Sequence, residues 1–249
     1  MTEQGNRWLL TRPDPMNGEL SRELTALGDV AWIHPLLCIE PLAEAALRLT
    51  EEPFPWEHVI FTSQPAVEHS SALLARLIGN HGLASTCYAV GDATRSKLAE
   101  YRIKARSGNE PGSESLLRAM LPLPPRQSVL LVTGEGGRTL IEDTLRAANH
   151  SVTRCEVYRR RSLVDSGLTR LVEAHEINRV LITSVQALEA LVQSLESTVY
   201  EKLTVVTLSE RIANVASNFG FPKVVVSKAM NSEAVRMALE SGNWVKDLC

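Results

Sequence analysis

Short apolar segments alternate with longer amphipathic segments along the chain. The short segments are bounded by turn residues, as buried strands are, and the longer ones place apolar residues three and four positions apart, as helices do. We expect strands at Trp8–Thr11, Val30–Ile33, His58–Thr62, Thr86–Val90, Val129–Thr133, Val152–Tyr158, Val180–Thr183, Leu203–Leu208 and Lys223–Val226. We expect helices at Glu19–Leu27, Ala66–Ile78, Thr94–Tyr101, Ser115–Met120, Thr139–Ala148, Leu168–Ala174, Ala187–Leu195, Glu210–Asn218 and Glu233–Leu239. This alternation is typical of parallel sheets covered by helices on both faces, so the predicted fold class is α/β.

The pattern occurs twice in the chain. Three short segments have similar counterparts further along, in the same order and at offsets of 118 to 122 residues. The matched pairs are Phe61–Val67 with Ile182–Leu188, Val90–Thr94 with Leu208–Ile212, and Leu9–Arg12 with Leu131–Gly134. The repeat predicts two similar α/β units of about 120 residues each, which is an ordinary domain size.

Two further segments, His34–Leu42 and Val157–Val164, follow the second strand of each half. The first carries Pro35 and Pro41, and the second carries the arginine run Arg159–Arg161. Two matched extended connectors are what a chain needs to cross twice between two lobes. The proline-rich stretch Leu121–Arg126 marks the break between the halves in the sequence.

Composition narrows the class of protein. The 249 residues are 44% hydrophobic and 22% charged, which is ordinary for a globular chain and excludes a fibrous or disordered one. No apolar run approaches the roughly 18 residues of a membrane span, and the N-terminus lacks the layout of a signal peptide, so we expect a cytoplasmic protein. The net charge of −3 and the 5% of aromatic residues argue against nucleic acid as a partner.

The four cysteines, Cys38, Cys87, Cys155 and Cys249, are far apart in the sequence. Metal and redox sites use closely spaced cysteines, so free buried thiols are the expected state. The segment His175–Arg179 has arginine where a second zinc-binding histidine would stand, which removes that metal site as well.

Small polar residues, most of them with a hydroxyl group, recur at the points where a predicted strand is followed by a helix. These positions are Thr11–Arg12–Pro13, Thr62–Ser63, Gly91–Asp92, Thr133–Arg138, Thr183–Ser184 and Ser209–Arg211. Ligands of open parallel sheets bind at the carboxyl ends of the strands, and a helix N-terminus accepts anions. The recurring set predicts a cleft, lined by both lobes, for a large ligand with many carboxylates. For any single hydroxyl, ordinary helix capping stays open as the alternative.

A glycine-rich turn, Gly134–Thr139, leaves a second function open. It begins like the dinucleotide-binding pattern but has Thr139 where the last glycine belongs, and Glu156 stands about where a ribose-binding acid would. A dinucleotide-dependent enzyme is therefore one alternative. A two-lobed binding or regulatory protein that catalyses no reaction is another, because fold does not fix function.

The chain resembles the uroporphyrinogen-III synthases over nearly its whole length. The residues that carry the resemblance, in order, are Thr11–Arg12–Pro13, Phe61–Thr62–Ser63, Val90–Thr94, Ser113–Leu117, Gly134–Arg138, Val157–Arg160, Thr183–Ser184 and Ser209–Arg211. Arg102 departs from the family pattern, which often has glycine there. The resemblance implies two flavodoxin-like lobes, each a parallel sheet flanked by helices, joined by a two-stranded connector. One lobe would hold residues 1–36 and 163–249 and the other residues 40–158, with connectors at 37–39 and 159–162.

The resemblance also implies an activity, a cyclising carbon–oxygen lyase of tetrapyrrole biosynthesis. The similar enzymes cyclise linear hydroxymethylbilane to uroporphyrinogen III, with loss of water and inversion of ring D, and use neither a metal nor an organic cofactor. Tyr158 matches the family tyrosine thought to assist loss of the hydroxyl. The implied substrate-binding residues are Ser63, Ser184 and Ser209, followed by Thr62, Thr94, Thr183, Ser115, Arg12 and Arg138. We expect no nucleic-acid or membrane partner and a monomer, and leave open a transient contact with the preceding enzyme of the pathway.

Overall fold

The computed structural model describes residues 5–42, 44, 56–78, 85–110, 112–121 and 123–241. The chain divides into two compact units, which we call unit 1 (Met1–Cys38 and Arg161–Cys249) and unit 2 (Ile39–Arg160). Cys249, and Pro122 of the predicted break, lie outside the described residues. Among the helices of the described part, none has the length and hydrophobicity needed to span a bilayer.

Unit 1 is built on a five-stranded sheet in which every neighbouring pair of strands is parallel. Its strands are β1 (Arg7–Leu10), β2 (Val30–Ile33), β9 (Arg179–Ile182), β10 (Thr204–Thr207) and β11 (Val224–Val226). The order across the sheet is β11-β10-β9-β1-β2, which is 2-1-3-4-5 when the strands are counted along the chain. That order is one of the two common orders of doubly wound sheets.

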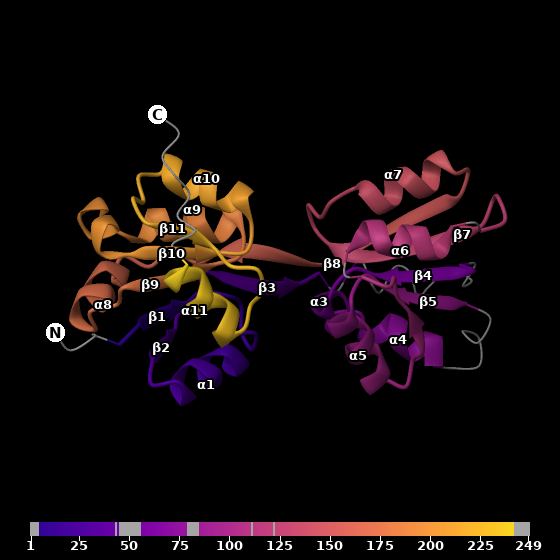
Figure 1. Ribbon diagram of the computed structural model, residues 1–249. Helices are drawn as coiled ribbons and strands as arrows, with labels where there is room; N and C mark the ends of the chain where they lie inside the picture. The colour runs from indigo at the N-terminus through magenta and orange to yellow at the C-terminus, as the bar shows by residue number, and fades with distance from the viewer. Residues whose placement is uncertain are drawn as a thin grey trace. The chain divides into compact units, whose positions relative to one another are not determined.

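Helices cover both faces of this sheet (Figure 1). Helices α8 (Leu168–Ala174), α9 (Val185–Ser194) and α10 (Glu210–Asn218) pack on one face, and α1 (Gly18–Ala26) and α11 (Ser232–Glu240) pack on the other. Successive side chains of a strand point to opposite faces, so Leu9 joins the first core while Trp8 and Leu10 join the second. A short 3-10 helix, η1 (Ser197–Lys202), precedes β10.

The second sheet has six strands in the order β3-β8-β7-β4-β5-β6, and it lies in unit 2 except for the first two residues of β3 and the last two of β8. Its strands are β3 (Leu37–Pro41), β4 (His58–Phe61), β5 (Thr86–Ala89), β6 (Ala105–Arg106), β7 (Ser128–Gly134) and β8 (Ser151–Ser162). The pairs from β8 to β6 are parallel. Strand β3 runs antiparallel to β8, because the Leu42 N–H donates to the Val157 carbonyl and the Leu163 N–H to the Leu36 carbonyl.

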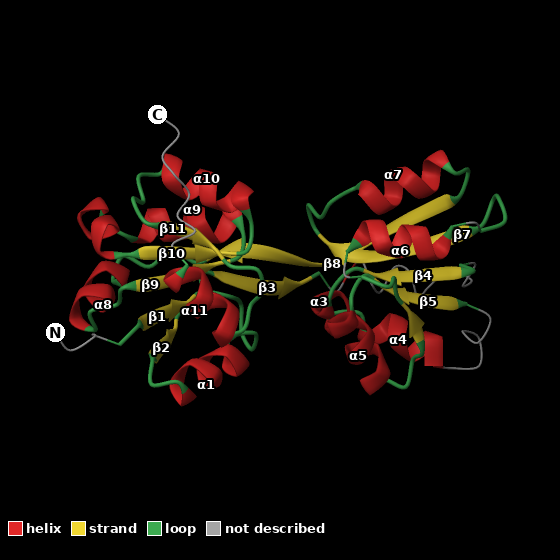
Figure 2. Ribbon diagram, viewed as in Figure 1, coloured by secondary structure: helices red, strands yellow, loops and turns green. Residues whose placement is uncertain are grey.

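This sheet also lies between two layers of helices (Figure 2). Helices α3 (Gln64–Glu68), α4 (Ser71–Ile78) and α5 (Asp92–Glu100) share one core with the sheet, and α6 (Ser113–Met120) and α7 (Leu140–Ala147) share the other. Both units are therefore parallel sheets flanked by helices, and the predicted α/β class is confirmed.

The two sheets have equivalent strand arrangements. The sequence repeat pairs β1 with β7, β9 with β4 and β10 with β5, and chain order extends this to β2 with β8 and β11 with β6. Replacing each strand of the order β11-β10-β9-β1-β2 by its counterpart gives β6-β5-β4-β7-β8, which is the observed order in the second sheet apart from its additional edge strand β3. The repeat seen in the sequence thus corresponds to a repeated topology.

The structure corrects two local predictions and contains two elements that were not predicted. The helix expected over Ala66–Ile78 is two helices, because a turn at His69–Ser70 ends α3, with the Ser70 hydroxyl bonded to the Val67 carbonyl. The strand expected to end at Tyr158 continues to Ser162 and pairs with β3. The two-residue strand β6 and the 3-10 helix η1 carry no periodic pattern and were not expected.

Candidate functional site

Hydroxyl side chains meet at the carboxyl ends of β4 and β7 in unit 2. Thr62 follows β4, and its Oγ1 donates to Oγ1 of Thr133 on β7 at 3.1 Å. Ser63 is the N-cap of α3, and its Oγ accepts from the Ala66 N–H at 3.2 Å. The same Ser63 Oγ lies 3.1 Å from the hydroxyl of Tyr158 on β8. The structure therefore joins three of the predicted residues, Thr62, Ser63 and Tyr158, at one edge of the sheet.

Tyr158 is the most enclosed member of this group, with 2% of its surface exposed. Its ring packs in the core beneath α3, with the His69 ring 6.3 Å away. Nη2 of Arg160 donates to the Tyr158 oxygen at 3.3 Å, and the Arg160 guanidinium carbon lies 5.8 Å from the ring centroid. The phenol oxygen is thus within hydrogen-bond distance of both a hydroxyl group and a cation.

Gly134 makes room for the Tyr158 ring. A Cβ atom at Gly134 would lie 2.5 Å from Tyr158 Cζ and 2.8 Å from its hydroxyl oxygen, far inside van der Waals contact. The glycine-rich turn is therefore explained by a tyrosine packed against its backbone. The alternative of a dinucleotide site expects Glu156 to bind a ribose. In the structure the Glu156 carboxylate is instead ion-paired with Arg154 at 2.9 Å.

Three other predicted residues of unit 2 lie outside this group. Thr94 is buried in the first turn of α5, and Ser115 is buried in α6, where its Oγ accepts from the Glu110 N–H at 3.0 Å. Arg138 is exposed in the loop between β7 and α7. Among the hydrogen bonds of the described residues, none joins these three to Ser63 or Tyr158.

Unit 1 carries the corresponding strand ends. Ser184 is the N-cap of α9 and accepts from the Ala187 N–H at 3.1 Å, with Thr183 half-buried before it. Ser209 occupies the N-cap position of α10, but its side chain makes no capping bond. Ser209 is therefore the serine whose hydroxyl is not used for helix capping.

Two more side chains lie beyond the end of β1. The Thr11 hydroxyl donates to the Leu181 carbonyl at 2.6 Å, a structural bond between neighbouring strands. Arg12 donates to the Met16 carbonyl at 2.9 Å, and burial lowers the pKa of its guanidinium without removing its charge near neutral pH.

Three residues at these edges were not among the site residues predicted from the sequence. Gly134 and Arg160 surround Tyr158, as described above. Thr207, the last residue of β10, is fully buried, and its Oγ1 has no hydrogen-bond partner among the described residues. Ser209, two residues later, could be predicted because it stands where a helix begins. Nothing in the sequence distinguishes Thr207 from other strand residues.

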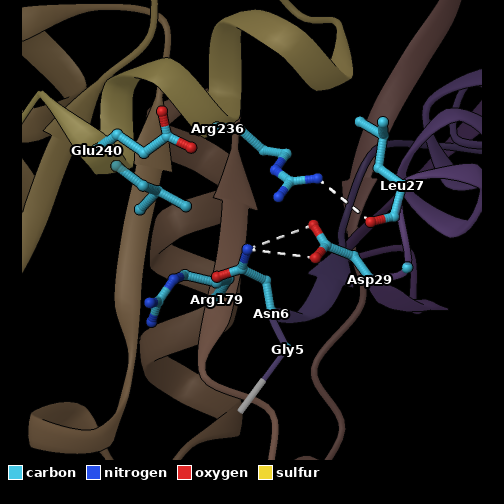
Figure 3. A pocket seen from close by; sticks show the side chains of 9 residues that line it. Gly5, Asn6, Leu27, Asp29, Arg179, Arg236 and Glu240 are labelled. Atoms are coloured by element: carbon cyan, nitrogen blue, oxygen red, sulfur yellow. Dashed lines mark hydrogen bonds between the residues drawn. The ribbon is translucent and has the colours of Figure 1, made fainter. Parts of the chain in front are cut away.

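A separate cavity of about 440 Å³ lies at the opposite, amino edge of the unit 1 sheet (Figure 3). Asn6 donates to both carboxylate oxygens of Asp29 at its floor, and Arg236 donates to the Leu27 carbonyl. Figure 3 shows that the Arg179 guanidinium points away from Arg236, so the two cations do not converge on a common point. Within the described residues, no group of three His, Cys, Asp or Glu side chains is placed to hold a metal ion.

Parallel sheets between helices, with hydroxyl groups gathered at the strand ends, are typical of α/β enzymes, whose ligands bind at those ends. The family model of "Uroporphyrinogen-III synthase HemD" matches residues 18–235. The uroporphyrinogen-III synthase of Salmonella typhimurium is 30% identical, and that of Escherichia coli 28%, each alignment covering 93% of this chain and 99% of the relative. This chain belongs to the uroporphyrinogen-III synthase family.

Solved structures show the same fold. The uroporphyrinogen-III synthetase of Helicobacter pylori superposes with a TM-score of 0.59 at 18% identity, over 95% of this chain and 99% of that one. A mutant uroporphyrinogen III synthase of Thermus thermophilus gives a TM-score of 0.57 at 16% identity, over 95% and 100%.

Proposed function

We propose that this protein cyclises hydroxymethylbilane to uroporphyrinogen III, with loss of water and inversion of ring D, as a step of tetrapyrrole biosynthesis. The observation that carries the proposal is the end-to-end similarity to proteins named uroporphyrinogen-III synthase, which spans 93% of this chain and 99% of those relatives. The proposed chemistry needs neither a metal nor an organic cofactor.

The substrate carries eight carboxylates, and the strand ends supply groups suited to them. Ser63 and Ser184 each accept a backbone N–H, which leaves the hydroxyl hydrogen to donate to a carboxylate oxygen. Ser209 has its hydroxyl unused at the start of the nine-residue helix α10, where the partial positive charge of the helix favours an anion. We propose these three serines as the principal binding groups. The second-rank binding residues are Thr62, Thr94, Thr183, Ser115, Arg12 and Arg138.

Tyr158 is the proposed proton donor to the leaving hydroxyl. Loss of that hydroxyl as water requires a proton, and a phenol within hydrogen-bond distance of the leaving oxygen supplies it. Because the similar reaction without an enzyme closes the ring readily but gives isomer I, the protein's larger task is to hold the substrate in the conformation that gives isomer III. Tyr158→Phe is therefore expected to lower kcat several-fold and to leave the product as isomer III.

The test is to supply hydroxymethylbilane to the purified protein and to separate the product isomers by chromatography. Isomer III in excess over a heat-denatured control supports the proposal. Isomer I alone, at the same ratio as in the control, overturns it and leaves a binding protein as the function. Unchanged kcat in Tyr158→Phe, with isomer III still formed, would remove the proton-donor role without removing the activity.

We also propose a fold type and bounds for the two lobes, a cellular location, an oligomeric state and a protein contact. The 2-1-3-4-5 strand order of unit 1 supports a flavodoxin-like lobe, and unit 2 has the equivalent arrangement begun at a different strand. The lobe boundaries at residues 1–36 with 163–249 and at 40–158, the cytoplasmic location, the monomeric state and a transient contact with the preceding enzyme of the pathway are proposed on the family resemblance.

A further inference from the structure

We propose that Arg160 and Gly134 are positioning residues that set the Tyr158 hydroxyl for proton transfer, Gly134 by admitting the ring beside a β-bulge and Arg160 by donating a hydrogen bond to the phenol oxygen. This inference rests on the proposed function of Tyr158 as proton donor.

A β-bulge in the β7–β8 pairing determines on which face of the sheet the Tyr158 side chain lies. Strands β7 and β8 pair regularly up to Thr133 with Glu156, and then Gly134 pairs with Tyr158, so Val157 is an extra residue on β8. In a regular strand Val157 and Tyr158 would point to opposite faces. Here both side chains pack in the same core, on the α3 side of the sheet. A bulge re-aims a side chain in this way, and without it Tyr158 would point away from Ser63.

Gly134 is the partner that this arrangement requires. It lies directly opposite Tyr158 in the β7–β8 register, and its backbone is in contact with the tyrosine ring. Any side chain at position 134 would clash with Tyr158, because even a Cβ would lie 2.5 Å from its Cζ, 2.7 Å from its Cε2 and 2.8 Å from its hydroxyl oxygen. The glycine therefore fixes how deeply the phenol sits at the end of the sheet.

The hydrogen bond from Arg160 leaves the phenol hydrogen of Tyr158 free for another partner. A guanidinium can only donate, so in the 3.3 Å bond the Tyr158 oxygen is the acceptor. The single hydrogen of the phenol is then available for Ser63 Oγ at 3.1 Å in the free protein, and for the leaving hydroxyl of the substrate in its place. Arg159, one residue earlier, belongs to a different contact, because its Nε bonds to Glu40 at 2.9 Å.

The positive charge of Arg160 also stabilises the charge that the step creates. The phenol O–H bond breaks as its proton passes to the substrate hydroxyl, the carbon–oxygen bond of that hydroxyl breaks, and water leaves. The electron pair of the O–H bond stays on the Tyr158 oxygen, next to Arg160. The proton that the substrate loses as the ring closes returns to this oxygen, so the residues end as they began and only water is released.

The test is a double-mutant cycle with Tyr158→Phe, in which kcat and KM for hydroxymethylbilane are measured in four proteins. Arg160→Gln is expected to lower kcat about fivefold, the effect of losing one hydrogen bond. It is expected to have almost no effect in the Tyr158→Phe background, where the acceptor oxygen is gone. Arg160→Lys, which keeps a charged donor, should recover part of the lost kcat. Arg159→Gln removes the same charge from the neighbouring position and should leave kcat unchanged.

The outcomes separate the two proposals. An equal fall in kcat in both backgrounds, or a change in KM alone, would show that Arg160 acts on substrate binding or on structure and would overturn this inference while the synthase function stands. An unchanged kcat in Tyr158→Phe would overturn it together with the proton-donor role. Formation of isomer I alone by the unmodified protein would overturn the proposed function itself.

Discussion

The substitution Gly134→Ala adds a single methyl group against the ring of Tyr158. The new Cβ would lie 2.5 Å from Tyr158 Cζ, whereas carbon atoms in good contact are about 3.5–4.0 Å apart, so ring or backbone must move by about 1 Å. The ring has little room, because only 2% of Tyr158 is exposed. A ring shift of that size displaces the Tyr158 hydroxyl relative to Ser63, which lies 3.1 Å away, and is expected to weaken the contact between them.

Two effects are expected from Gly134→Ala. Overpacking of a buried site costs about 1–3 kcal/mol of unfolding free energy, which lowers the melting temperature by several degrees. Displacement of the hydroxyl lowers kcat to about the level of Tyr158→Phe. Gly18→Ala is the matched control, because a Cβ at Gly18 meets nothing within 4 Å.

Thermal unfolding and steady-state kinetics check both effects. The stability cost should nearly vanish in a Tyr158→Leu background, because the smaller side chain removes the atoms that the new methyl group meets. Wild-type stability and wild-type kcat in Gly134→Ala would refute the close packing of Gly134 on Tyr158. A stability cost of the same size in the Tyr158→Leu background would refute its assignment to this ring.

Further predictions concern the strand-end serines and the buried thiols. Ser184→Ala removes a capping bond and should lower the unfolding free energy by about 1 kcal/mol. Ser209→Ala has no capping bond to lose and should raise KM with little change in stability. An unchanged KM in Ser209→Ala would remove Ser209 from the binding groups. Burial raises the pKa of Cys87 and Cys155 from 9.0 to about 11, so alkylation at pH 8 should be slow at both in the folded protein and fast after unfolding. Because the folded pKa is the higher one, the stability that these thiols contribute is complete below pH 9 and is lost between about pH 9 and 11, which denaturant titrations at pH 8 and 10.5 would detect.

Much of the fold follows from local patterns in the sequence. The buried strands β1, β4, β7 and β9 are short apolar runs bounded by turn residues, and such runs are recognisable without knowing their neighbours. The internal repeat also indicated that the two units are similar, and the matched segments do lie at equivalent places in the two sheets. Failures occurred where the hydrophobic pattern carries no signal. A local turn at His69–Ser70, closed by the Ser70 hydroxyl on the Val67 carbonyl, splits one amphipathic stretch, and β6 is a strand of two residues that forms by pairing with β5.

The candidate site, like the fold, could be predicted from the sequence only in part. The hydroxyls of Ser63 and Ser184 could be found because residues that cap helices stand next to predicted strands. The surroundings of Tyr158 could not, because they depend on a bulge that adds one residue to β8, and a bulge leaves no mark in the hydrophobic pattern. Gly134 was noticed as part of a glycine-rich turn, and only the packed tyrosine ring shows which neighbour the missing side chain accommodates.

The isomer composition formed from hydroxymethylbilane, followed as the protein concentration is raised from far below the substrate concentration to equal it, tests the proposed activity most directly. We predict that the fraction of isomer III rises with protein concentration until isomer I is no longer detected, and that catalytic amounts of protein suffice. Isomer I as the only product at equal concentrations of protein and substrate would contradict this function.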